Sequence, residues 1–110
     1  MCRFGDIYIA EKNLTGNLHR IKQTVLVASD DKANKNSSIV TVIPIIGAAE
    51  RNELQSYVLI GDYGMAEENI AIIEQVTTLE KSQLLVKVGG IQGTVYAGQV
   101  KQALKKHFGL

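Results

Sequence analysis

The run SIVTVIPII, residues 38–46, decides the fold class of this chain. Side chains alternate between the two faces of a β-strand, and here both alternating sets are mostly apolar. A strand that is apolar on both faces is central in a sheet or covered on both sides. Pro44 has no N–H group for a strand ladder, so we expect pairing to end near this residue and a loop to begin close behind it.

Five further runs rich in β-branched and aromatic residues flank this strand, separated by polar or Gly-containing segments. They are residues 6–10, 24–29, 56–60, 70–76 and 84–88. Short strands at this spacing predict a mainly β protein curled into a small β-barrel. Two connections between the predicted strands have recognisable sequence patterns. Residues 30–34 (DDKAN) predict a turn rich in side chains that bond the backbone, and residues 80–83 predict one helical turn.

Only the C-terminal segment has a long helical pattern. Thr94 is a suitable N-cap, and apolar residues recur after it at spacings of three and four. This stripe comprises Tyr96, Val100, Ala103, Leu104 and Phe108, and we expect it to pack on the barrel. The glycines of residues 89–93 lack the surroundings of a nucleotide-binding loop, and they predict a turn from the last strand into this helix.

Length and composition limit the possible functions. A chain of 110 residues with 45% hydrophobic and 21% charged residues predicts one folded domain over residues 1–110. No apolar run reaches the roughly 20 residues that span a bilayer, and residues 1–6 do not resemble a secretory signal. We therefore expect a cytoplasmic protein with no membrane contact. A single cysteine, Cys2, and no Cys/His cluster predict no disulfide, no metal and no cofactor.

The connection between the first two strands, residues 11–23, carries the residues most suited to chemistry. His19, Arg20 and Lys22 place three potential cations within four positions. If this end is extended, Arg20 and Lys22 share one side of the strand and Gln23 takes the other. Two cations on a rigid scaffold can hold phosphate oxygens, and a nearby imidazole can transfer protons near neutral pH. The alternative is a solvated loop without a ligand.

Four stretches of the sequence resemble the MazF/PemK family, the toxins of bacterial toxin-antitoxin pairs. They are residues 3–10 (RFGDIYIA), 24–31 (TVLVASDD) with Asn34-Lys35 behind them, 42–45 (VIPI) and 73–81 (IEQVTTLEK). Each is short, but they occur in the family's order and spacing along nearly the whole chain. The resemblance implies an SH3-like β-barrel with a C-terminal helix, usually a homodimer, that binds an antitoxin peptide.

The resemblance also implies metal-independent cleavage of single-stranded RNA, in which the ribose 2′-hydroxyl attacks the adjacent phosphate. This chemistry needs a base, donors that stabilise the five-coordinate phosphorus, and an acid for the departing 5′ oxygen. Three family positions differ here: Gln23 stands at an arginine, Ile46 at a threonine or serine, and Thr77 at a second arginine. Glu74 matches a family carboxylate.

Two hypotheses follow from these substitutions. The first is a diverged RNA-cleaving toxin, in which a neighbouring cation replaces the missing arginine and a histidine or carboxylate handles protons. Its candidate catalytic residues are His19, Arg20, Lys22 and Glu74. Its candidate RNA contacts are Lys12, Asn17, Arg20, Lys22, Gln23 and Arg51. The second is a catalytically inactive barrel that binds RNA or an antitoxin-like peptide in the same groove, around residues 11–23 and 46–55. A third interpretation is a small regulatory dimer unrelated to toxins.

Overall fold

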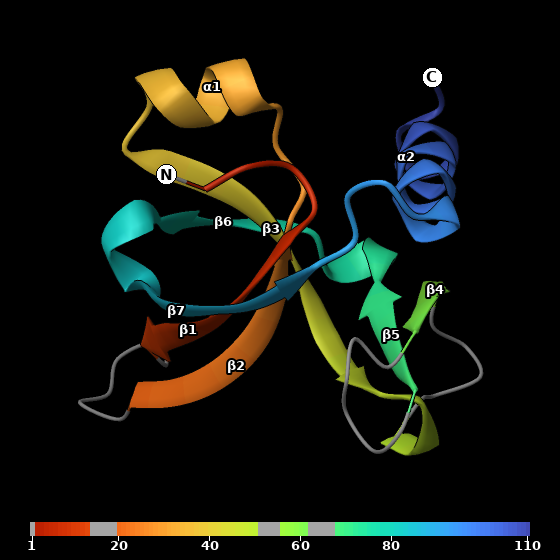
Figure 1. Ribbon diagram of the computed structural model, residues 1–110, viewed down its shortest axis with the longest axis horizontal. Helices are drawn as coiled ribbons and strands as arrows, with labels where there is room; N and C mark the ends of the chain where they lie inside the picture. The colour runs from red at the N-terminus through yellow and green to blue at the C-terminus, as the bar shows by residue number, and fades with distance from the viewer. Residues whose placement is uncertain (1, 14–19, 51–55, 62–67) are drawn as a thin grey trace.

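The computed structural model describes residues 2–13, 20–50, 56–61 and 68–110, which form a seven-stranded antiparallel sheet with a C-terminal helix (Figure 1). The strands are β1 (Asp6–Asn13), β2 (Arg20–Val27), β3 (Ile39–Gly47), β4 (Tyr57–Gly61), β5 (Asn69–Ile72), β6 (Thr77–Glu80) and β7 (Leu84–Gly90). The helices are α1 (Asp31–Asn36) and α2 (Val95–Phe108), with 3-10 turns η1 (Ala48–Glu50), η2 (Ile73–Gln75) and η3 (Lys81–Gln83). The predicted class, mainly β with a C-terminal helix, is confirmed.

Strand β3 lies at the centre of the sheet, as its two apolar faces predicted. It pairs with β2 along one edge and with β6 and then β5 along the other. Its pairing with β2 ends at Pro44, opposite Val25, as expected for a residue without an N–H group. β3 then continues to Gly47 by pairing with β5, and η1 follows directly.

The prediction of one strand over residues 70–76 is wrong. The chain instead forms β5, the turn η2 and β6, so that two short strands pair with the two ends of β3. The turn replaces ladder bonds: the Ile73 N–H donates to the Ser56 carbonyl (3.0 Å), and the Val76 N–H donates to the Ile73 carbonyl (3.1 Å). Ile73 remains fully buried in the turn. An apolar run can be buried either as a strand or as a turn, so the pattern of residues 70–76 did not reveal the break between β5 and β6.

The predicted barrel does not close among the described strands. The strand order is β4-β5-β3-β2-β1-β7, with β6 also on β3, so β4 and β7 stand at the two ends. The helical turn predicted at residues 80–83 forms as η3, between β6, which pairs with β3, and β7, which pairs with β1. Glu80 and Gln83 form a capping box there, and the Gln83 amide donates to the Glu11 carbonyl (3.0 Å). The turn is thereby bonded to β1.

Residues 30–34 form the start of helix α1, where a turn had been expected. The Asp30 carboxylate caps this helix by accepting the Lys32 N–H (3.1 Å). Asn34 is buried, and its amide donates to the Ser29 carbonyl (2.9 Å). Asp and Asn side chains stabilise turns and helix N-termini by the same hydrogen bonds to the backbone. Composition therefore does not distinguish a turn from a short helix at these residues.

The two faces of the sheet each carry an apolar core. Leu26 belongs to one buried cluster and its neighbour Val25 to the other, as strand alternation requires. Helix α2 follows its N-cap Thr94, as predicted, and covers the first cluster through the fully buried Val100. It stands on the side of the molecule that carries β4 and β5 (Figure 1). The end of the β1–β2 hairpin that carries Asn13 and Arg20 lies away from this helix (Figure 1).

Candidate functional site

The β1–β2 hairpin holds most of the predicted RNA contacts, and its register shows how they are arranged. Ala10 pairs with Gln23, and Lys12 pairs with Ile21. Directly paired residues share a face and alternate along the strand, so Lys12 and Gln23 lie on one face as diagonal neighbours, about 7–8 Å apart. Both side chains are half-buried. This face therefore presents an ammonium group next to an amide group.

Lys22 takes the opposite face of the same strand. It pairs with Glu11, and its side chain is exposed. The segment is extended, as the sequence analysis assumed, and alternation therefore separates Lys22 from Gln23. A cation at position 22 does not occupy the space of a cation at position 23.

Gln23 and Ile46 lie beyond the point at which their two strands stop pairing. The β2–β3 ladder ends with Val25 opposite Pro44. Past this pair, Ile46 pairs with Ile70 of β5, whereas Gln23 pairs with Ala10 of β1. Both side chains are half-buried. At these two positions the family resemblance implies a guanidinium and a hydroxyl, and here they present an amide and an alkyl group.

Two other predicted site residues, Glu74 and Thr77, come later in the sequence. Thr77 is exposed and pairs with Val42, four residues along β3 from Ile46, which corresponds to about 13 Å of strand. Glu74 is exposed on η2, which contacts α2 and lies well away from the N-terminal end of β2 (Figure 1). Among the described candidates, the structure therefore brings Lys12 and Gln23 together, and it does not bring Glu74 to Lys22.

Part of the predicted site lies outside the described residues. His19, Asn17 and Arg51 fall in this part of the chain. For Arg20, the structure gives the backbone position, which is the first residue of β2, paired with Asn13. Among the residues that are described, no group of three or more His, Cys, Asp or Glu side chains could hold a metal ion. Across the same residues, no helix is long and apolar enough to cross a membrane.

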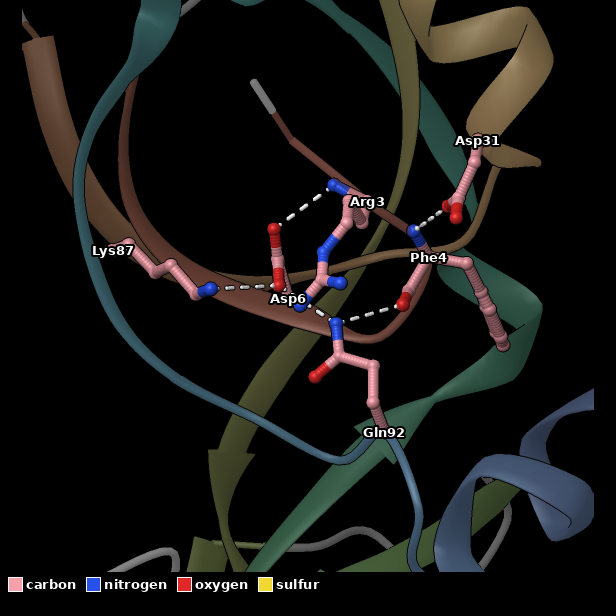
Figure 2. A network of polar contacts seen from close by, with 6 residues as sticks. All are labelled: Arg3, Phe4, Asp6, Asp31, Lys87 and Gln92. Atoms are coloured by element: carbon pink, nitrogen blue, oxygen red, sulfur yellow. Dashed lines mark hydrogen bonds and ion pairs between the residues drawn. The ribbon is translucent and has the colours of Figure 1, made fainter.

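Sequence reasoning missed a buried polar network around Asp6 (Figure 2). Asp6 is fully buried and accepts the Arg3 N–H (2.9 Å) and the Gln92 side-chain amide (2.7 Å), while the Lys87 ammonium lies 3.1 Å from its Oδ1. Burial alone would raise the pKa of Asp6. The hydrogen bonds from Arg3, Gln92 and Lys87, with the charge of Lys87, outweigh burial and hold this pKa below its ordinary value.

The network explains the opening motif of residues 3–6. Gly5 has a φ of 90°, which residues with a side chain rarely adopt, and its N–H donates to the Val27 carbonyl (2.9 Å). Gln92 also donates to the Phe4 carbonyl (2.9 Å), and Asp31 accepts the Phe4 N–H (2.7 Å). The motif therefore ties the N-terminus to α1, β7 and the turn before α2. Its carboxylate is held by donors and is a structural group, not a base.

The fold and the pair formed by Lys12 and Gln23 define a class of small antiparallel β protein, with polar side chains on the β1–β2 hairpin and a C-terminal helix beside β4. Residues 3–108 match the family described as the PemK-like, MazF-like toxins of type II toxin-antitoxin systems. The chain belongs to this family. The resemblance noted from four short stretches is thereby confirmed over nearly the whole sequence.

Solved structures with a similar fold are distant in sequence. Mycobacterium tuberculosis toxin MazF-mt6 is 18% identical, with a TM-score of 0.75 over 96% of this chain and 97% of that chain. An endoribonuclease in complex with its cognate antitoxin from a mycobacterial species is 17% identical, with a TM-score of 0.77 over 100% and 97%. A further mycobacterial endoribonuclease has 17% identity and a TM-score of 0.75 over 99% and 92%. Comparison with curated proteins gave no match.

Proposed function

We propose that this protein is a toxin-antitoxin component that binds single-stranded RNA at the pair formed by Lys12 and Gln23 on the β1–β2 hairpin, and that it cleaves this RNA slowly. The observation that supports the proposal is the register that places Gln23 diagonally next to Lys12 on one face of the hairpin. Phosphate groups are bound by ammonium and amide donors, and the flanking strands hold these donors in fixed positions. Family membership supports RNA as the ligand.

The proposed reaction is a transesterification without a metal. The 2′-hydroxyl loses its proton to a base and attacks the neighbouring phosphorus, and the bond to the 5′ oxygen breaks as that oxygen takes a proton. Lys12 and the Gln23 amide stabilise the extra negative charge on the phosphorane. His19 is the proposed proton carrier because imidazole both accepts and donates protons near neutral pH. Arg20 and Lys22 are the proposed contacts for flanking phosphates, whereas Glu74, on η2, takes no part in this scheme.

A second candidate function is supported by the substitutions themselves. Gln23, Ile46 and Thr77 lack the guanidinium and hydroxyl groups that the resemblance implies. Loss of one such donor typically lowers a rate a hundredfold to a thousandfold. An inactive module that binds RNA, or an antitoxin-like peptide, in the same groove would retain the fold without the chemistry. Incubation of the purified protein with mixed-sequence single-stranded RNA in the presence of a chelator separates the two candidates, because only the first produces fragments.

Removal of the Lys12 ammonium is expected to weaken RNA binding. With a 2′-O-methylated single strand, which cannot be cleaved by this route, Lys12→Ala should bind about tenfold more weakly than the wild type. The slope of log affinity against log salt should also fall by about 0.7, the contribution of one phosphate contact on a single strand. Lys32→Ala, which removes an exposed lysine on α1, is the control. Equal losses in the two variants at two salt concentrations would reject this site.

The assembly state and partners are part of the same proposal. We propose a cytoplasmic homodimer that is neutralised by a cognate antitoxin, as the family resemblance implies. Exposed apolar side chains on β4, Tyr57 and Leu59, support association of two copies. Sedimentation equilibrium of the purified protein should give twice the mass of 12.0 kDa for one chain. A single species at the monomer mass across micromolar concentrations would contradict the dimer.

A further inference from the structure

A cavity of about 230 Å³ lies between helices α1 and α2, which stand at the same end of the molecule (Figure 1). Its walls come from four parts of the chain: the N-terminal segment, the end of β2, α1 and α2. The lining residues are Phe4, Ala28, Asp30, Asp31, Lys101 and Leu104. The volume is below the range of about 300–1,000 Å³ that is typical of drug-sized sites, so a ligand that fits here is smaller.

The apolar part of this cavity is fixed by the packing of the N-terminal segment. The Phe4 N–H donates to the Asp31 carboxylate (2.7 Å), and the Phe4 ring points away from Asp6 (Figure 2). The side chains of Phe4, Ala28 and Leu104 are half-buried and pack against the first core cluster. Their outer atoms therefore form a small apolar surface in the cavity, which an apolar group of a ligand can cover.

The cavity is lined by charges of both signs. Asp30 and Asp31 come from the N-cap and the first residue of α1, and Lys101 comes from α2. Among the described residues, no carboxylate lies within ion-pair distance of the Lys101 ammonium, which is placed over the Phe4 ring, 4.8 Å from the ring centroid. A ring face attracts a cation but does not balance its charge. The two signs therefore face one cavity without neutralising each other.

Each of the two carboxylates keeps one oxygen available to a ligand. Asp30 accepts the Lys32 N–H through Oδ2 (3.1 Å), and Asp31 accepts the Phe4 N–H through Oδ1. The second oxygen of each accepts no hydrogen bond from the part of the chain that the structure describes. The next cations along the two helices, Lys32 and Lys105, do not line the cavity, and α2 carries no Asp or Glu. Acceptors therefore stand on the α1 side and a donor on the α2 side.

We propose that this cavity binds a free α-amino acid with an apolar side chain. The ligand's ammonium donates to Asp30 and Asp31, and its carboxylate accepts from Lys101. Its side chain covers the apolar surface of Phe4 and Leu104. The two carboxylates disfavour a simple anion, and the lysine disfavours a simple amine. None of the lining residues is a proposed RNA contact, so the inference does not require RNA binding or cleavage.

Titration of the isotopically labelled protein with L-leucine, followed by NMR, tests this inference directly. Leucine should shift the amide resonances of Phe4, Asp31 and Lys101, and the shifts should saturate. N-acetyl-leucine lacks the ammonium and leucinamide lacks the carboxylate, so each should bind weaker by about tenfold or more. Glycine, which lacks the apolar side chain, should also bind more weakly.

Three outcomes of this titration would overturn the proposal. The first is the absence of saturable shifts at millimolar leucine. The second is equal binding of leucinamide, because the ligand would then be an amine or the N-terminus of a peptide. The third is equal binding of N-acetyl-leucine, because a carboxylate alone, such as the C-terminus of a peptide, would then be sufficient.

A matched pair of lysine variants locates the carboxylate of the ligand. Lys101→Gln should weaken leucine binding by about tenfold and leave leucinamide binding unchanged, because only leucine has a carboxylate for this lysine. Lys105→Gln removes an exposed lysine one turn later on α2 that does not line the cavity, and it should leave both affinities unchanged. Equal losses of leucine binding in the two variants would overturn the assignment to this cavity.

A charge-neutral variant on the α1 side locates the ammonium of the ligand. Asp31→Asn keeps an oxygen that can accept the Phe4 N–H and removes the negative charge, so leucine binding should weaken by about tenfold. Thermal unfolding followed by circular dichroism checks that this variant folds, and Asp30→Asn replaces it if it does not. Leucine binding at wild-type strength in the folded variant would contradict the proposed contact.

Discussion

Replacement of Asp6 with alanine (Asp6→Ala) is expected to lower the free energy of unfolding by about 3 kcal/mol. The carboxylate is fully buried and accepts the Arg3 N–H, the Gln92 amide and the Lys87 ammonium. Its removal leaves the Arg3 N–H without this acceptor and loosens the joint between the N-terminus, β7 and the turn before α2. Hydrogen bonds to a buried charge are each worth about 1.5–3 kcal/mol, and the partial exposure of Lys87 reduces its share.

Urea denaturation followed by circular dichroism measures this loss as a lower midpoint at an unchanged slope. Glu68→Ala, which removes an exposed carboxylate on the surface, is the control and should change the midpoint little. A loss for Asp6→Ala no larger than that of the control would show that the network contributes nothing to stability.

The same carboxylate makes stability depend on pH in acid. The pKa of Asp6 is lowered in the folded state, so the unfolded chain binds more protons as the pH falls toward and below its ordinary value of 3.8. The stabilisation is therefore present above that value and is lost as the pH falls through the folded-state pKa. Wild-type urea midpoints should decline over this acid range, and the decline should be smaller in Asp6→Ala. Parallel pH profiles would contradict the assignment to Asp6.

Restoration of a guanidinium by Gln23→Arg is expected to raise the rate of single-stranded RNA cleavage a hundredfold to a thousandfold. Position 23 is diagonal to Lys12, so an arginine there points to the same face of the hairpin as this lysine. A planar guanidinium donates two parallel hydrogen bonds to phosphate oxygens, which an amide cannot do. The gain should appear in single-turnover cleavage and should exceed any gain in RNA affinity, because the added donors act mainly on the phosphorane.

Thr24→Arg provides a matched control for this gain of function. It adds the same side chain one residue away, but strand alternation directs it to the opposite face of β2. Its cleavage rate should stay within a few fold of the wild type, while its net charge equals that of Gln23→Arg. Equal stimulation by both variants would mean that added charge, and not position 23, raises the rate. No stimulation by Gln23→Arg would favour the binding module over the nuclease.

Much of the fold could be read from apolar patterns. The run at residues 38–46 predicted a central strand because both of its faces are apolar, and the spacing after Thr94 predicted α2. The break in residues 70–76 was not predictable in this way, because Ile73 is equally well buried in a turn. The bond from the Gln83 amide to the Glu11 carbonyl also joins segments far apart in the sequence, which no local pattern indicates.

The candidate site was only partly predictable for the same reason. Sequence placed Gln23 and Ile46 at substituted positions, but the position of Lys12 next to Gln23 follows from the register of β1 on β2. Lys22 and Gln23 are neighbours in the chain, yet alternation sends them to opposite faces of the strand. The partners of Asp6 could not be found from the sequence, since Lys87 and Gln92 are more than eighty residues away.

The sequence by itself determined the class of fold, the family and the residue types available for RNA chemistry, because hydrophobic periodicity and colinear motifs are local properties of the chain. The tertiary structure decided which of those residues share a face and which carboxylate is fully enclosed by donors. Those outcomes depend on strand register and on burial. Both are set by contacts between segments that the chain order does not place together.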